Sequence, residues 1–463
     1  MSLEPLKEQN IPEPLPLKKI IGPSFILLGL GLGSGEIILW PYLTSHFGMG
    51  IIWGAILGIT FQFFINMEIE RYTLVHGESI FVGFARKYKY LPLWFLASTF
   101  IPWVWPGIIA SSAKLIGSIF GFKETQYLAI VFLITIGLIL SLGKTLYKTV
   151  ERFQKVLISI GVPSIFILTL LIAKKSHWVA LAKGVVGIGD GYIVLPENIA
   201  IISFLAALAY AGAGGNLNLA QSFYIREKGY GMGKFAMKLS SLLTGNKQKV
   251  SLEGSKFEPT KENLTNFKIW WKNINTEHFA VFWFTGLITI VLLALLSFST
   301  TYNTNNNLSD ITFVLSESIA IGKMLFPLAG LIFLAIAGLT LFGTQLTVLD
   351  ATSRILTENL ILSPILKIKE KNISKIYFIV LWAQIFTGIL IFMLGLTEPL
   401  KLLIIAAVLN AFAMFIHTGL TFWTNLTLLD KNLRPNLFRK IAIISALLFY
   451  GGFSIYVLIE KVI

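Results

Sequence analysis

Residues 22–48 read GPSFILLGLGLGSGEIILWPYLTSHFG, an apolar stretch long enough to cross a bilayer but crowded with glycine near its centre. The acid Glu36 directly follows the last glycine of the central cluster. That cluster consists of Gly29, Gly31, Gly33 and Gly35. Because glycine has no Cβ and tolerates unwound backbone, the stretch predicts a membrane helix that stops and restarts within the bilayer.

A second stretch, residues 201–227, reads IISFLAALAYAGAGGNLNLAQSFYIRE and has the same pattern. When the two are aligned, Gly215 matches Gly35 and Asn216 matches Glu36. Glycine-interrupted spans at matching positions of two halves are the best sequence pointer to a transporter binding site. The alternative is that the glycines only let helices pack closely, but packing glycines are typically spaced three or four apart on one face.

The rest of the chain is equally typical of a membrane protein. Its 463 residues are 55% hydrophobic and only 13% charged, with a mean hydropathy of +0.74 and no cysteine. A soluble domain carries about 25% charged residues. Runs of apolar residues predict eleven membrane spans. Their expected bounds are 20–46, 49–74, 91–120, 125–143, 147–173, 198–226, 277–301, 325–357, 374–396, 399–428 and 437–459.

The loops predict the orientation of the chain. With a cytosolic N-terminus, the cytosolic segments hold 30 of the 38 Lys and Arg residues, in agreement with the positive-inside rule. An odd number of spans then leaves the C-terminus outside, and we expect the plasma (cell inner) membrane. The net charge of +14 is therefore explained by membrane topology, without a nucleic-acid partner. The lipid bilayer is the expected partner, and the sequence does not indicate an oligomeric state.

The predicted fold class is an all-α membrane protein of eleven transmembrane helices. It contains a 5+5 inverted repeat, with helices 1 and 6 discontinuous, and one extra helix. The expected organisation is a cytosolic tail, a first repeat, a second repeat with a cytosolic loop at 227–276, and the extra helix. These parts cover residues 1–19, 20–173, 198–428 and 437–463, respectively.

Unwinding a helix inside the bilayer frees backbone groups, each of which costs several kcal/mol if it stays unpaired. Such a break persists when a ligand or another protein group satisfies it, so the two breaks are the candidate substrate site. The candidate residues are Gly33, Ser34, Gly35, Glu36, Tyr210, Ala213, Gly214, Gly215 and Asn216. Glu36 could bind a cation together with Asn216, carry a proton, or simply cap the restarted helix.

At these two breaks the chain resembles the Nramp family of divalent-metal transporters, which has the leucine-transporter-type fold. The family's Asp-Pro-Gly-Asn motif falls on Gly33-Ser34-Gly35-Glu36, and its Met-Pro-His-Asn motif falls on Ala213-Gly214-Gly215-Asn216. The family's metal-binding Asp is therefore Gly33 here, and its thioether ligand is Ala213. Since soft sulfur ligands favour transition metals, their loss argues against manganese or iron and leaves a hard cation such as Mg²⁺ or Ca²⁺.

Three further pairs of polar residues lie in predicted spans. In the leucine-transporter fold a sodium site joins helix 1 to hydroxyls of helix 8, so the resemblance makes Thr344 and Thr347 candidates for a coupling ion, unless they only bond their own helix. Candidates for gating or proton relay are the charged pair Asp350 and Arg354, four residues apart, and the span-ten residues Asn410 and His417. A structural role is the alternative for each.

The predicted function is an ion-coupled secondary active transporter, a symporter that resembles Nramp and moves a metal cation, with Mg²⁺ or Ca²⁺ favoured. The alternative is a sodium- or proton-coupled carrier of a small organic solute. A membrane receptor or scaffold and a channel are rivals from other classes. We find no phosphate-binding loop, dinucleotide fingerprint or zinc-protease motif, so neither an enzyme nor a resident cofactor is expected.

Overall fold

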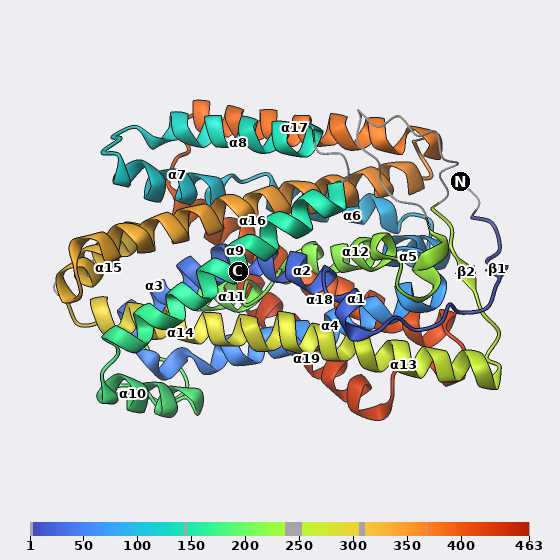
Figure 1. Cartoon of the computed structure of the whole chain (residues 1–463), viewed down its shortest axis with the longest axis horizontal. Helices are drawn as coiled ribbons and strands as arrows, with labels where there is room; N and C mark the ends of the chain where they lie inside the picture. Colours follow the sequence, from blue (N-terminus) through green and yellow to red (C-terminus); the bar gives the residue numbers. More distant parts are fainter. Residues whose placement is uncertain (1–2, 143–145, 237–251, 305–310, 367, 463) are drawn as a thin grey trace.

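The computed structural model describes residues 3–142, 146–236, 252–304, 311–366 and 368–462, and within them it is a bundle of long helices (Figure 1). The middle of the predicted loop 227–276, from 237 to 251, lies outside these described residues. So do residues 1–2, 143 and 463, which fall at the edges of other predicted segments.

Ten helical segments of the described chain are long and apolar enough to cross a membrane. They run over Pro23–Phe47, Met49–His76, Leu91–Ile119, Thr125–Leu142, Leu146–Ile172, Lys261–Thr301, Pro327–Leu362, Ile373–Met393, Pro399–Leu428 and Leu437–Ile459. These correspond to ten of the eleven predicted spans. The remaining one, span six, is the interrupted pair α11 (Ile201–Ala209) and α12 (Gln221–Lys228).

The uninterrupted spans are single helices. They are α4 (Trp53–His76), α8 (Thr125–Leu142), α9 (Leu146–Ile172), α16 (Pro327–Leu362), α17 (Ile373–Met393), α18 (Pro399–Leu428) and α19 (Leu437–Val462). Shorter helices lie between them: α1 (Leu17–Ile20), α5 (Ile80–Lys87), α10 (Lys175–Val185) and α15 (Thr312–Met324). Single turns complete the chain: η2 (Met49–Ile51), η4 (Gly231–Phe235), η6 (Glu370–Asn372) and η7 (Lys431–Leu433).

The two ends of the bundle carry different short elements. At one end, which we call the N-terminal end, strand β1 (Lys7–Glu8) pairs in parallel with β2 (Ser255–Lys256), and α5 lies close by (Figure 1). At the other end, the far end, lie α10 and α15 (Figure 1). Lys256 and Glu8 form an ion pair between the two strands at the N-terminal end, the end for which the sequence predicts the cytosol.

Span seven begins earlier than the predicted residue 277. Helix α13 (Lys261–His278) continues through a π-helical turn, η5 (Phe279–Phe284), into α14 (Thr285–Thr301). The hydroxyl oxygen of Thr260 accepts a hydrogen bond from the backbone N–H of Asn263 and so caps the start of α13. The first half of this helix is polar, so hydropathy alone gives no sign of it.

Span one is interrupted more mildly than its glycines suggest. Helix α2 (Pro23–Gly31) ends in a turn at residues 32–33, and the chain then continues as a π-helical segment, η1 (Ser34–Leu39), into α3 (Trp40–Phe47). Taken together, Pro23–Phe47 is long and apolar enough to cross a membrane as one segment. A single π-turn of this kind is a common device at functional sites in helices.

Span six is broken outright. Between α11 and the 3₁₀ turn η3 (Gly215–Ala220), residues 210–214 are not helical. Gly212, Gly214 and Gly215 all have positive φ angles of 136°, 74° and 53°, a backbone region that side chains with a Cβ rarely adopt. The glycine cluster predicted this break, and the left-handed backbone explains why glycine is required there.

Span three carries an interruption that we did not predict. Helix α6 (Leu91–Trp103) ends and α7 (Gly107–Ile119) begins after a short non-helical stretch at residues 104–106. Pro106 precedes the restart and Pro102 lies just before the end of α6. Because proline lacks an N–H and clashes with the preceding turn, these two residues account for the break.

Candidate functional site

The two glycine clusters meet in the structure. A Cβ built on Gly31 would stand 2.7 Å from the backbone carbon of Gly212, and one built on Gly35 would stand 1.7 Å from the carbonyl oxygen of Tyr210. Only glycine allows spans one and six to approach this closely. The sequence alignment of the two segments therefore corresponds to a direct backbone contact between the two interruptions.

Side chains from spans three and ten surround the break in span six. The side-chain amide of Asn216 donates to the hydroxyls of Ser98 and Thr99 on α6, both at 2.9 Å. From α18, the Asn410 amide donates to the Tyr210 hydroxyl at 3.0 Å, and His417 Nε2 lies 3.0 Å from the carbonyl oxygen of Gly215. The spacing of seven residues between Asn410 and His417 thus directs both side chains at the same break.

Several polar atoms at this break have no hydrogen-bond partner among the described residues. They are the side-chain carbonyl oxygens of Asn216 and Asn410, Nδ1 of His417 and the indole nitrogen of Trp103. The Trp103 ring stacks on Tyr210 with their centroids 5.5 Å apart. A buried polar atom left unpaired costs about 1–3 kcal/mol, so these four atoms mark a place suited to a hydrogen-bonding ligand.

Glutamine 62 was missed by the sequence reasoning. Gln62 on α4 donates to the carbonyl of Ala209 at 3.0 Å and accepts from the N–H of Gly214 at 3.2 Å. These are two of the backbone groups that the break in span six releases. One side chain therefore stabilises the break from outside, and fewer freed groups are left for a ligand than the glycine pattern alone implies.

Glu36 lies beside α14, whereas the side-chain amide of Asn216 bonds to α6. The Glu36 side chain is fully buried, and neither carboxylate oxygen has a partner among the described residues. A Cβ on Gly286 of α14 would lie 3.7 Å from Glu36 Oε1, beside the apolar side chains of Ile59 and Leu28. Capping of the restarted helix is wrong for this structure, because η1 receives no side-chain cap. Binding of one metal ion by Glu36 and Asn216 together stays a prediction.

The threonines of span eight lie where span one is interrupted. Thr344 donates its hydroxyl hydrogen to the carbonyl oxygen of Gly29 at 2.9 Å, and a Cβ on Gly33 would meet the Thr344 hydroxyl at 2.5 Å. Thr347 bonds instead to its own helix at Gly343, and Gln154 of α9 donates to it. The hydroxyl of Thr344 and the carbonyl of Gly29 are thus paired oxygens of the kind that bind small cations.

Asp350 and Arg354 form the expected ion pair, with Arg354 Nε 2.9 Å from Asp350 Oδ2. Both are buried, and the pair extends further than the sequence suggests. The hydroxyl of Tyr377 donates to Asp350 at 2.7 Å, and Arg354 also pairs with Glu227 on α12. This network joins spans six and eight toward the N-terminal end of the bundle. Its gating role stays a prediction.

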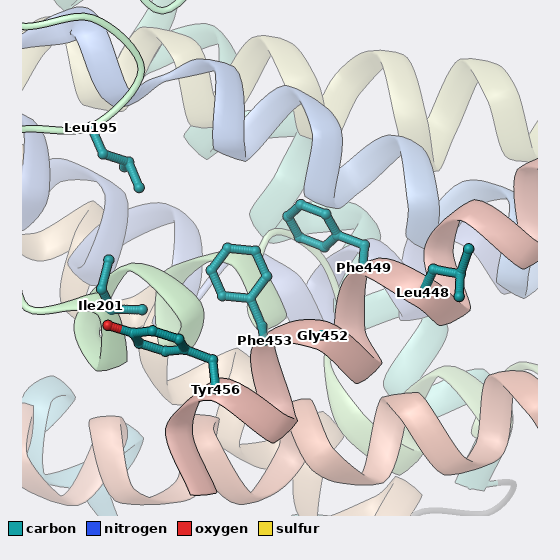
Figure 2. A pocket seen from close by; sticks show the side chains of 7 residues that line it. All are labelled: Leu195, Ile201, Leu448, Phe449, Gly452, Phe453 and Tyr456. Carbon is teal, nitrogen blue, oxygen red and sulfur yellow. The ribbon is translucent and has the colours of Figure 1, made fainter. Parts of the chain in front are cut away.

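Two other features bear on the kind of ligand. Among the described residues, no group of three or more His, Asp or Glu side chains is placed to hold a metal ion. A groove of about 500 Å³ lies elsewhere, between α19 and the segment before α11, with Tyr456 directed toward Ile201 (Figure 2). Its lining is almost wholly apolar: Leu195, Ile201, Leu448, Phe449, Gly452, Phe453 and Tyr456. It suits hydrocarbon and does not suit a polar substrate.

Comparison with known proteins identifies the fold. No family model and no curated protein sequence matches the chain. Structures of two variants of a manganese transporter from Eremococcus coleocola superpose on this chain with a TM-score of 0.70 at 10% sequence identity. The two alignments cover 97% and 98% of this chain, and each covers 89% of the transporter. The same transporter in complex with an aromatic bis-isothiourea compound gives a TM-score of 0.64, again at 10% identity, over 97% of this chain and 90% of the transporter.

These likenesses confirm the predicted fold class. The chain is a multi-pass, all-α membrane protein with the leucine-transporter-type fold. At 10% identity they establish the fold only.

Proposed function

We propose that this protein is a cation-coupled secondary transporter whose substrate is a small polar organic solute bound at the break in span six. The observation that carries the proposal is the convergence of Asn216, Asn410 and His417 on that break. Each has a buried polar atom with no hydrogen-bond partner in the described part of the chain. Amides, hydroxyls and an indole are the groups that orient an uncharged or zwitterionic solute. The stacked rings of Trp103 and Tyr210 add a flat apolar wall.

The coupling cation has a separate candidate position between spans one and eight. The hydroxyl oxygen of Thr344 and the carbonyl oxygen of Gly29 are 2.9 Å apart and belong to helices from different repeats. Hard oxygen ligands favour Na⁺ and similar ions over soft metals. A cation there would bind to both helices and so favour the conformation in which they are in contact.

Alternating access requires one group of helices to move against another. The ion pairs that join span six to spans five and eight at the N-terminal end are Lys228 with Glu151 at 2.8 Å, Arg226 with Glu358 at 3.0 Å, and Arg354 with Glu227. These pairs link the helices that the fold expects to move with those it expects to stay fixed. Their rupture would open a path from that end to the break.

Transport of a metal cation is the second candidate, and two observations favour it. The carboxylate of Glu36 is fully buried and has no hydrogen-bond partner within the described ranges, and structures of a manganese transporter share the fold. Two observations weigh against it: Glu36 lies among apolar side chains, and no cluster of three metal-ligating residues occurs in the described part of the chain.

Uptake into proteoliposomes tests the proposal. The panel comprises Mg²⁺, Ca²⁺, Mn²⁺ and a set of radiolabelled polar solutes that carry amide or ring N–H groups, each with and without a Na⁺ or H⁺ gradient. We expect gradient-dependent uptake of a solute, which Asn216→Ala abolishes and which Asn198→Ala, a change at an exposed loop position, leaves intact. Uptake of a metal that Glu36→Gln abolishes would favour the second candidate. Normal transport by both Asn216→Ala and Glu36→Gln would contradict both site assignments.

A further inference from the structure

A second cluster of buried polar groups lies closer to the N-terminal end of the bundle, away from the substrate site. It draws one helix from each of spans one, two, six and seven: Ser24 from α2, Glu70 from α4, Gln221 from α12, and Glu277 and His278 from α13. All five side chains are at most 3% exposed. We call this set the Glu70–Glu277 cluster.

Its members are joined by direct hydrogen bonds. His278 Nδ1 lies 3.1 Å from Glu70 Oε1 and 2.8 Å from the Ser24 hydroxyl. Gln221 donates to Glu70 at 2.8 Å, and Ser24 donates to Glu277. The backbone N–H of Gly22, at the start of span one, donates to Glu277 at 3.2 Å. The cluster therefore ties the start of span one to the three other helices.

The charges of this cluster are unusual for the molecule. Other buried carboxylates near the same end have a basic partner, and for four of them it is an arginine: Glu68 with Arg71, Glu78 with Arg86, Glu227 with Arg354, and Glu358 with Arg226. No described lysine or arginine forms an ion pair with Glu70 or Glu277. Two carboxylates and one imidazole would then bury a net negative charge, which is strongly unfavourable unless a proton neutralises it.

Titratable groups from the surrounding elements do not replace that missing cation. The titratable groups around the cluster are Tyr147, Glu151 and Lys228, which lie beside Gly22, together with Tyr230 and with Arg439 of α19. Glu151 already has two lysine partners, Lys155 and Lys228, and Arg439 lies 3.4 Å from Glu68 and forms no ion pair with Glu70. None of these groups forms an ion pair with Glu70 or Glu277, so within the described residues the two carboxylates share only hydrogen-bonding partners and His278.

Unpartnered atoms give independent support for an exchangeable ligand. Glu70 Oε2, His278 Nε2 and Gln221 Oε1 are all buried without a hydrogen-bond partner among the described residues. Along α4, Gln62 and Asn66 lie two turns and one turn before Glu70, on the same helix face. Asn66 and Asn218 of η3 likewise have unpartnered side-chain amides. Polar atoms therefore run from the break in span six down to the cluster.

We propose that Glu70, Glu277 and His278 form a proton-binding site that holds one exchangeable proton and controls the attachment of the start of span one. The proton comes from water at the N-terminal end and is shared among two carboxylates and an imidazole, with no other bond made or broken. An ionised Glu277 accepts strong, charge-assisted hydrogen bonds from Gly22 and Ser24. Protonation of Glu277 weakens both bonds and loosens span one. Only this consequence for transport rests on the proposed function; proton binding does not.

Infrared difference spectroscopy on the purified protein in lipid nanodiscs tests the site without any substrate. We expect a protonated-carboxyl C=O band that grows as the pH is lowered from about 8 to about 5. Glu70→Gln and Glu277→Gln should each remove or shift the midpoint of this band. Glu262→Gln, at an exposed position on the same helix α13, is the matched control and should leave it unchanged. A band that is the same in both cluster variants and in the parent would overturn the proposal.

Two further measurements keep the result interpretable. Ser24→Ala removes one donor to Glu277 while keeping both carboxylates, so a proton site predicts a shift in the midpoint of the band, whereas a purely structural cluster predicts none. If Glu277→Gln fails to fold in a thermal unfolding assay, Ser24→Ala decides alone. A titrating band in a protein that transports no member of the uptake panel would leave this site standing while contradicting the proposed function.

Discussion

Gly35 of span one lies directly against Tyr210 of span six, so closely that a Cβ on Gly35 would stand 1.7 Å from the Tyr210 carbonyl oxygen. No flexible side-chain end can yield at this point, because the obstacle is backbone. The close approach of the two helix interruptions therefore requires glycine at position 35, and the substrate site proposed at the break in span six depends on this contact.

Replacing Gly35 by alanine should separate the two interruptions. We expect a loss of about 1–3 kcal/mol in the free energy of unfolding, as for overpacking in other tight interiors, together with loss of transport. Gly452→Ala is the matched control, since a Cβ on this helical glycine of α19 would meet no atom within 4 Å. Thermal unfolding and uptake measured on both variants check the prediction, and equal behaviour of the two would contradict it.

Replacing Gln62 by leucine should destabilise the break in span six. The change leaves the carbonyl of Ala209 and the N–H of Gly214 without their partner, at a cost of about 1–3 kcal/mol for each group that stays unpaired. Hydrogen–deuterium exchange of the peptide covering residues 205–220 should accelerate. Gln126→Leu, at a half-exposed position on α8, serves as the control. Unchanged exchange in Gln62→Leu would mean that other groups satisfy the break.

Replacing Arg354 by methionine should leave Asp350 and Glu227 as unpaired buried charges. Removing one member of a buried ion pair costs about 3–5 kcal/mol. Lys155 is more exposed, and Lys155→Met leaves Glu151 paired with Lys228, so this change should alter stability by less than about 1 kcal/mol. Chemical unfolding of the two variants measures the difference. Because Arg354 also joins span six to span eight, we expect water to reach the break in span six faster in the Arg354→Met variant than in the parent.

The sequence was most informative where one strong physical constraint acts on many residues. Hydropathy located the membrane spans, because a bilayer demands about 20 apolar residues for each crossing helix. The glycine cluster at 212–215 predicted the break in span six, because only glycine adopts its left-handed backbone readily. The polar helix α13 was missed for the converse reason: it lies at the beginning of span seven, where hydropathy carries no signal.

The candidate site was predicted less completely, because its contacts join residues far apart in the sequence. Gln62 and Ala209 are 147 residues apart, and Asn216 and Ser98 are 118 apart, so no local pattern connects them. Two local features of the sequence did point to the site. They are the polar residues within apolar spans and the prolines Pro102 and Pro106 on either side of Trp103. The burial of Glu36 could be predicted from its apolar span. The helix that it faces could not be predicted, because the π-helical segment after residue 33 changes the direction of the side chains that follow.

The accessibility of Ala213 tests the central claim most directly. The chain contains no cysteine, so Ala213→Cys introduces a single thiol at a position that is 1% exposed in this structure. Alternating access predicts that a membrane-impermeant thiol reagent modifies this cysteine in proteoliposomes, and that the transported solute slows the reaction. Ala446→Cys, equally buried on α19 but away from both interruptions, should stay unreactive. If Ala213→Cys is as inert as Ala446→Cys under every ion gradient and solute tested, the break in span six is no substrate site.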